Sequence, residues 1–119
     1  MKIDPDSVPN SVATAVEALV VSLEKDDIEY IRSTKGTSGH FTIGMAIRNS
    51  WSLWEKETPI VQDAIKTYKI AHGDDISGLI FAWAWAKVRG EDFDPLAFVE
   101  RYHEHWAKTG KTSIEAAGL

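Results

Sequence analysis

The sequence predicts an all-α fold, a compact bundle of about five to six helices that forms a single domain over residues 1–119. Apolar residues recur at helical spacing along most of the chain, and no segment alternates between apolar and polar residues as a strand does. Residues 76–89 are apolar all round a helical wheel. This pattern predicts a central helix that the other helices surround.

Three helices are predicted in the first half of the chain. The second is short, begins at a cap supplied by Asp26 or Asp27, and ends at the loop of residues 35–39. The third covers residues 40–54, with the sequence HFTIGMAIRNSWSLW. The apolar positions that define the first helix are Val12, Val16, Leu19, Val20 and Leu23. Each of these helices is expected to bury one face in the bundle.

The fourth and fifth helices have recognisable boundary residues. The fourth begins at Thr58, an N-cap residue followed directly by a proline, and is expected to stop near residues 72–73. Asp74 or Asp75 is expected to cap the fifth helix, and Gly90 is placed at its C-terminal end. The predicted central helix therefore lies between a polar turn near residues 72–75 and a turn that begins at Gly90.

A sixth helix is predicted after Asp94, which a proline follows directly. The chain from residue 110 onward and residues 1–10 are expected to be flexible ends. The apolar residues that the sixth helix is expected to bury are Leu96, Phe98, Val99, Tyr102 and Trp106.

Composition excludes several classes of function. The net charge is -5, and no run of Lys or Arg occurs, so binding to nucleic acid through phosphate contacts is not expected. A partner with a basic surface suits this charge better. The chain has no cysteine, which excludes disulfides, thiolate metal sites and a thiol nucleophile. We therefore expect a protein partner, with a homo-oligomer as an open possibility.

The chain also lacks the signals of export and membrane insertion. Its first ten residues, MKIDPDSVPN, contain no apolar signal segment. The longest apolar run, residues 76–86, is far shorter than the roughly 20 residues that a spanning helix needs. Absence of cysteine fits a reducing compartment. The sequence thus predicts a cytoplasmic protein that does not bind membranes.

Arg48 lies within the apolar arc of the helix predicted at residues 40–54. Its planar guanidinium could clamp a carboxylate or phosphate ligand. The alternative is a buried ion pair with Asp74 or Asp75 at the start of the central helix, and we favour it because an unpaired buried charge is heavily penalised. Asn49 lies at the edge of the same arc and is expected to satisfy backbone groups at the following turn.

Acidic and histidine side chains offer two further candidates for chemistry. Asp74 and Asp75 follow His72 closely and could hold a divalent cation, but a capping and helix-dipole role is favoured. His103 and His105 are two positions apart on a helix and so point to opposite sides, which excludes a shared metal ion. His103 is expected to pack with one hydrogen bond. No metal or cofactor is predicted.

The chain is rich in tryptophan, with five residues at positions 51, 54, 83, 85 and 106. Packing in the core is the favoured role, and a stacking wall for a ligand is the alternative. Trp83 and Trp85 project to different sides of the central helix and are assigned structural roles together with Arg48, Asp74 and Asp75. No Gly-rich phosphate loop, hydrolase signature or kinase motif occurs, so catalysis is not favoured.

The R-N-x-W-x-L-W motif at residues 48–54, preceded by His40-Phe41 and Gly44, is followed by His72, Asp74-Asp75, Ser77-Gly78 and Ile80. This pattern resembles a small bacterial and phage-borne helical domain family of unknown function, over roughly residues 23–106. The resemblance implies that the third helix and the start of the fifth form one recurring unit in a cytoplasmic protein. It implies no activity.

Taken together, the residues predict a non-catalytic helical module that binds a protein partner, and the resemblance suggests a regulator or inhibitor in bacterial or phage biology. The alternative is a small-ligand or nucleotide-binding protein, with or without catalysis. Its site would comprise Arg48, Asn49, Trp51, Trp54, Asp74 and Asp75.

Overall fold

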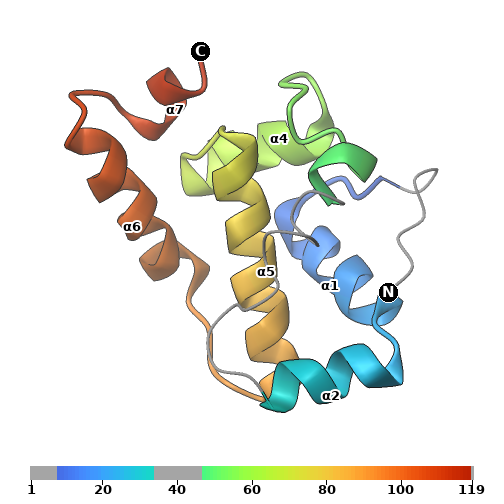
Figure 1. Ribbon diagram of the computed structural model, residues 1–119. Helices are drawn as coiled ribbons and strands as arrows, with labels where there is room; N and C mark the ends of the chain where they lie inside the picture. The colour runs from blue at the N-terminus through green and yellow to red at the C-terminus, as the bar shows by residue number, and fades with distance from the viewer. Residues whose placement is uncertain (1–7, 34–46, 119) are drawn as a thin grey trace.

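The computed structural model describes residues 8–33 and 47–118, and within these ranges the regular elements are all helices. The central element is α5 (Gly73–Arg89), with α1 (Val12–Ser22) on one side and α6 (Pro95–Ala107) on the other (Figure 1). The second helix, α2 (Lys25–Ser33), crosses the C-terminal end of α5. The all-α prediction and the central position of residues 76–89 are confirmed.

Among the described helices, α1 and α5 make the most extensive contact. Ser11 caps α1 and forms a capping box with Thr14, so two backbone N–H groups at the start of the helix are satisfied. Asp63 Oδ2 accepts a further hydrogen bond from the Val12 N–H at 2.8 Å. The residues of α1 that are fully buried are Val12, Ala15, Val16 and Leu19. The predicted amphipathic helix is therefore present with its apolar face in the core.

The start of α2 differs from the prediction. It begins at Lys25 instead of after Asp26 or Asp27, because Asp27 acts from inside the first turn and accepts a hydrogen bond from the Glu24 N–H. Arg89 at the end of α5 donates from Nε to the Ile31 carbonyl at 2.9 Å, which joins the two helices. The predicted loop of residues 35–39 lies outside the described residues.

The third predicted helix ends earlier than expected. Residues 47–50 are helical and residues 51–54 form a turn, whereas residues 40–46 lie outside the described part of the chain. Ser52 has φ 53°, a left-handed conformation that ends the helix. Trp51 and Leu53 stay in the core, at 2% and 1% exposure, but Trp54 leaves the apolar arc and is 51% exposed.

The fourth helix consists of α4 (Pro59–Asp63) and a π-helical turn, η1 (Ala64–Tyr68). Its predicted start, with Thr58 as the N-cap and a proline after it, is confirmed. It ends at Tyr68, before the predicted end near residues 72–73. The reason is that Lys69 takes the left-handed conformation, with φ 58°, and caps the helix.

The central helix starts earlier than predicted. His72 is its N-cap, and the His72 Nδ1 atom accepts a hydrogen bond from the Asp74 N–H at 3.1 Å. Asp74 and Asp75 lie in the first turn and do not cap the helix, so that prediction is wrong. Gly90 ends α5 with φ 71°, as predicted. Large side chains of α5 that are fully buried are Ile76, Leu79, Ile80, Phe81 and Trp85.

The helix α6 starts as predicted but is less buried than predicted. Asp94 accepts hydrogen bonds from two N–H groups of the first turn, and the proline follows it. Val99 is the buried residue of the helix, whereas Leu96 is 57% exposed, contrary to expectation. Phe98, Tyr102 and Trp106 are half-buried. The elements that α6 contacts are α5, η1 and α7.

Residues 113–116 of the C-terminal segment, which was expected to be a flexible end, form a helix. A short helix, α7 (Ser113–Ala116), follows α6, and Thr112 caps it through a capping box with Glu115. In the described part of the chain, no helix combines the length and the apolar character that crossing a bilayer requires.

A substitution in α1 tests the packing of α1 against α5. We expect Leu19→Ala to lower the free energy of unfolding by about 2–5 kcal/mol, because it leaves a cavity at a fully buried site. The matched control is Val21→Ala on the same helix, where the side chain is 82% exposed and the change should stay within about 0.5 kcal/mol. Urea denaturation measures both. A loss below about 1 kcal/mol for Leu19→Ala would contradict this packing.

Candidate functional site

Arg48 is buried against the first turn of α5. The residue is 8% exposed, its Nη1 donates a hydrogen bond to Ser77 Oγ at 2.9 Å, and its Nε lies 3.4 Å from Asp74 Oδ1. Ser77 Oγ in turn donates to the Asp74 carbonyl at 3.0 Å. The buried position and the ion pair with the start of the central helix are confirmed, with Asp74 and not Asp75 as the partner.

The two sides of this ion pair are in different environments. The Arg48 side chain is 10% exposed, whereas the Asp74 side chain is 61% exposed. Removing the arginine would therefore leave a carboxylate that water can solvate. Removing the carboxylate would leave a buried cation whose hydrogen-bond partner among the described residues is the Ser77 hydroxyl, and this is the more costly loss.

Asp75 connects α5 to α6. It is buried, and its Oδ2 accepts a hydrogen bond from Trp106 Nε1 at 2.8 Å. Burial raises the pKa of Asp75, while the Trp106 N–H and the nearby His72 oppose this rise. Burial, with a smaller contribution from the Asp75 charge, raises the pKa of Tyr102 to about 12. Sequence reasoning missed Trp106 as the partner, although an indole N–H and a buried carboxylate are a natural donor and acceptor pair.

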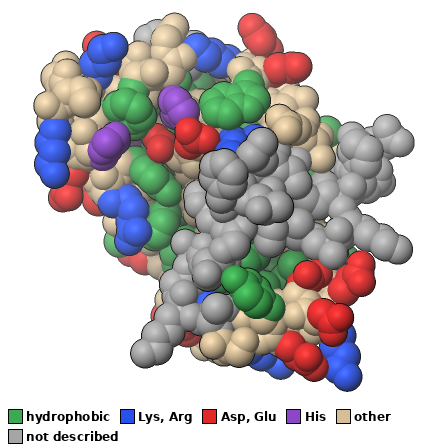
Figure 2. All heavy atoms as spheres, in the orientation of Figure 1, with side chains coloured by type: hydrophobic (Ala, Val, Ile, Leu, Met, Phe, Trp, Pro, Cys, Tyr) green, Lys and Arg blue, Asp and Glu red, His purple; other side chains and the backbone are tan. Residues whose placement is uncertain are grey.

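Four rings form a continuous row across this end of the molecule, here called the aromatic row: Trp54, His72, Trp106 and His105. Neighbouring ring centroids are 5.6, 5.8 and 4.8 Å apart along the row. Trp54 and His105 at its two ends are exposed. Figure 2 shows histidine side chains on one face of the molecule beside acidic and hydrophobic side chains. The row thus combines apolar surface with polar ring atoms.

Trp54 is held in place although half of it is exposed. The left-handed turn at Ser52 redirects the chain, and the indole ring lies so close to Gly73 that a Cβ atom there would be 2.7 Å from Trp54 Cε3. The ring of His72 meets it edge to face, and the Arg48 guanidinium lies 6.0 Å from its centroid. The sequence signal for this contact is Gly73, which lies between His72 and the acidic pair. Any side chain at this position would displace the indole.

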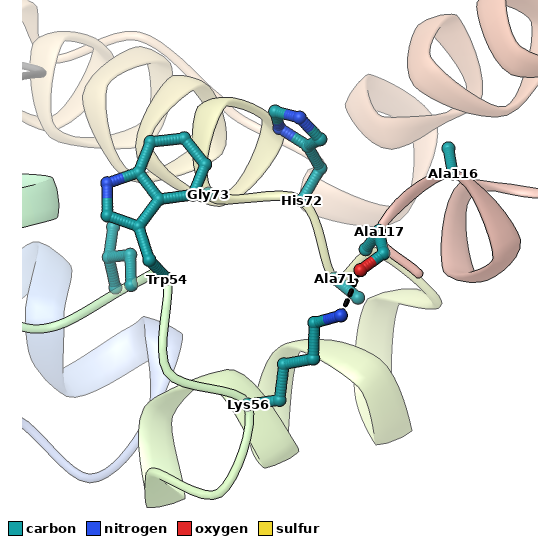
Figure 3. A pocket seen from close by; sticks show the side chains of 8 residues that line it. Trp54, Lys56, Ala71, His72, Gly73, Ala116 and Ala117 are labelled. Carbon is teal, nitrogen blue, oxygen red and sulfur yellow. Dashed lines mark hydrogen bonds between the residues drawn. The ribbon is translucent and has the colours of Figure 1, made fainter. Parts of the chain in front are cut away.

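A small hollow of about 170 Å³ lies beside Trp54 (Figure 3). Trp54 and Lys56 line it from the turn before α4, and His72 lines it from the start of α5. Lys56 Nζ donates a hydrogen bond to the Ala117 carbonyl, so the end of α7 closes one side. Sequence reasoning did not select Lys56, since its role depends on a residue 61 positions away.

The remaining candidates are dispersed. Trp51 is in the core. Asn49 is exposed and makes no side-chain hydrogen bond to the described residues, so the expectation that it satisfies backbone groups of the turn at residues 51–54 is wrong. Trp83 is half-buried, stacked on Phe93, whereas Trp85 is buried and its Nε1 has no hydrogen-bond partner among the described residues. The structure therefore brings together Arg48, Trp54 and Asp74.

The histidines of α6 have separate roles. His103 Nδ1 lies 2.8 Å from Ser113 Oγ, which agrees with the expectation of a packed ring with one hydrogen bond. His105 belongs to the aromatic row. Over the described ranges, no group of three or more His, Cys, Asp or Glu side chains is arranged to hold a metal ion.

A protein-family model matches most of the chain. A family model described as "Domain of unknown function (DUF6794)" matches residues 8–88, which include α1, α2, α4, η1 and nearly all of α5. The helices α6 and α7 lie outside the matched range. No curated protein and no solved structure matches the chain.

Substitutions of the two partners in the Arg48 ion pair should have unequal effects on the free energy of unfolding. Asp74→Asn should lower the free energy of unfolding by about 1–2 kcal/mol, because the buried guanidinium loses its counter-charge. Arg48→Met should change it by less than about 1 kcal/mol, since an apolar side chain of similar length fills the site and Asp74 is solvated. Urea denaturation measures both changes. The control is Asp26→Asn, an exposed carboxylate in the first turn of α2. The opposite order of effects would contradict this description.

Asp75 predicts a specific dependence of stability on pH. Because burial raises its pKa, the folded state holds the Asp75 proton more tightly than the unfolded chain does. This contribution to stability is present at low pH and is lost as the pH rises above about 4 through the raised pKa.

Asp75→Asn keeps an oxygen that can accept the hydrogen bond from Trp106 Nε1, but the amide side chain cannot ionise. We therefore expect the stability of this variant relative to the parent to increase as the pH rises above about 4, and then to level off. Urea denaturation from pH 3 to 8 measures this difference. Trp106→Phe removes a hydrogen bond that lowers the Asp75 pKa, so the stability of this variant should depend more steeply on pH than that of the parent. A constant or falling difference would show that Asp75 is not destabilised by burial.

Proposed function

The chain belongs to the DUF6794 family of domains of unknown function, and we propose that it is a non-catalytic helical module that binds a protein partner. The aromatic row is the contact surface in this proposal, and Trp54 is the residue that inserts into the partner. One observation carries the proposal: Trp54 is 51% exposed, yet its ring is fixed by Gly73, His72 and Arg48.

A fixed, half-exposed tryptophan has the properties of an interface anchor. Tryptophan is enriched among the residues that dominate binding energy at protein interfaces. A ring that is already held in one position loses little conformational freedom when a partner covers it. Trp54 and His72 also lie inside the range that matches the family, residues 8–88, so the anchor belongs to the domain itself.

The polar groups near Trp54 support a protein partner over a small ligand. The Arg48 guanidinium is occupied by Ser77 and Asp74, and the Asp75 carboxylate by Trp106. These groups would have to break internal contacts before they could bind a ligand. The surface that needs no rearrangement is the exposed part of the aromatic row.

Charge indicates the chemistry of the partner. The Asp74 side chain is 61% exposed, its Oδ2 lies 3.8 Å from His72 Nδ1, and the whole chain has a net charge of -5. A partner surface with an apolar recess for Trp54 and a basic side chain beside it would complement this face. Nucleic acid would be repelled by the same charge. A small acidic domain of this kind suits a cytoplasmic regulator or inhibitor of the protein it binds.

Substitution of the anchor tests the proposal. A partner is first isolated by crosslinking in native extract and purified, and its affinity for the parent and variants is then measured by calorimetry. We expect Trp54→Ala to weaken binding at least about tenfold, because the central anchor is lost.

The matched control is Val21→Ala, which removes an apolar side chain that is 82% exposed on α1. This variant should bind as the parent does. Circular dichroism establishes that both variants are folded. Equal affinity of Trp54→Ala and the parent would rule out the aromatic row as the contact surface.

The alternative is a small-ligand or nucleotide site at Arg48, Asn49, Asp74 and Asp75 with a tryptophan as its wall. The position of Trp54 favours it, because this ring lies 6.0 Å from the Arg48 guanidinium and lines a small hollow on the surface, although none of the four polar residues lines that hollow. A thermal-shift screen of nucleotides and small acids distinguishes the two proposals. A stabilisation of several degrees that is lost in Arg48→Lys would support the ligand site, because bidentate geometry is lost in that variant. It would count against the interaction module.

A further inference from the structure

A second and larger hollow, of about 540 Å³, lies between the end of η1 and the helices α6 and α7. This volume is within the range of about 300–1,000 Å³ that is typical of small-molecule pockets. It shares no lining residue with the hollow beside Trp54. Most of its lining comes from residues 100–114, beyond the range that matches the family.

Lys69 lines this hollow in a backbone conformation that lysine rarely adopts. It caps the π-helical turn η1 with φ 58°, a left-handed position where glycine or asparagine is normally favoured. Both the π-helical turn and the left-handed lysine are irregular features of a kind that concentrates at functional sites. A glycine would adopt this left-handed backbone conformation with less strain. We therefore attribute the lysine at this position to its side chain, which lines the hollow.

The charged side chains that line the hollow carry a net positive charge. Lys69 and Lys111 contribute two positive charges, and Glu100 contributes one negative charge. Lys69 Nζ donates a hydrogen bond to the Lys66 carbonyl at 3.0 Å, and two N–H groups of the ammonium have no partner in residues 8–33 and 47–118. His103 holds Ser113 through Nδ1, so Nε2 is its remaining polar atom.

The rest of the lining includes apolar side chains. Ala107 comes from α6 and Ile114 from α7, with the two lysines at the ends of the adjoining elements. A ligand that fits both parts has one negative charge, to match the single net positive charge of the lining, and an apolar body.

From this arrangement we propose that the hollow binds a small organic monocarboxylate with an apolar body. The carboxylate lies between Lys69 and Lys111, and the apolar body packs on Ala107 and Ile114. The site is separate from the aromatic row, so it does not depend on the proposed protein interaction.

Calorimetry with sodium octanoate as the probe tests the chemical class. Acetate supplies the charge alone, 1-octanol the apolar body alone, and inorganic phosphate a different anion. We expect octanoate to bind at least tenfold more tightly than each of the other three. Comparable binding of octanol or phosphate would overturn the assignment to monocarboxylates, and so would an absence of octanoate binding at millimolar concentration.

Substitution of Lys69 separates ligand binding from stability. Lys69→Gly should keep or raise the melting temperature, because glycine suits the left-handed backbone, and should weaken octanoate binding at least tenfold. Lys69→Asn is the second variant, since asparagine also tolerates this conformation and carries no charge. Lys111→Gln should weaken binding in the same way.

The matched control is Lys66→Gln, an exposed lysine of the same π-helical turn that does not line the hollow. It should bind octanoate as the parent does. Unchanged binding in both folded Lys69 variants would overturn the proposal. A loss in Lys66→Gln equal to that in Lys69→Asn would also overturn it, because general surface charge would then explain the binding.

Discussion

The first turn of α5 holds together parts of the chain that are distant in sequence. Arg48 reaches it from the segment before α4, through Ser77 and Asp74, and Trp106 reaches it from α6, through Asp75. Its own N-cap, His72, contacts the rings on both sides. The aromatic row exists because these contacts converge on one helix end.

At this end of the helix, buried polar contacts lie beside partly exposed rings. A helix N-terminus favours negative charge, so Asp74 and Asp75 are well placed in the first turn. Burial of Asp75 works against this advantage by raising its pKa, and the Trp106 hydrogen bond offsets part of the cost. The carboxylates thus orient a cation and an indole, and the exposed surface here combines the rings with the Asp74 carboxylate.

The two hollows differ in what surrounds them. The smaller one lies beside Trp54 and is closed on one side by the Lys56 contact to the end of α7. The larger one is formed by η1, α6 and α7 and has two lysines on its lining. Both depend on α7, a helix of four residues that lies outside the range matching the family. The C-terminal part of the chain therefore adds surface to a domain whose core is formed by the preceding helices.

The sequence by itself determined the helical class, the central position of residues 76–89, several helix boundaries and the burial of Arg48. These features follow from local chemistry, because apolar periodicity, proline after a capping residue and glycine at a helix end act within one or two turns. The same information located the acidic pair near the start of the central helix. It did not determine which carboxylate would pair with Arg48.

Only the tertiary structure decided that choice, because Asp74 and Asp75 differ by one position on a helix and therefore face different neighbours. Asp74 meets Arg48, whereas Asp75 meets an indole that comes from another helix. The helix before Trp54 ends early at Ser52, and this end changes Trp54 from an expected core residue to an exposed one. Such outcomes depend on contacts between residues far apart in the chain, and the periodicity of a single helix carries no information about them.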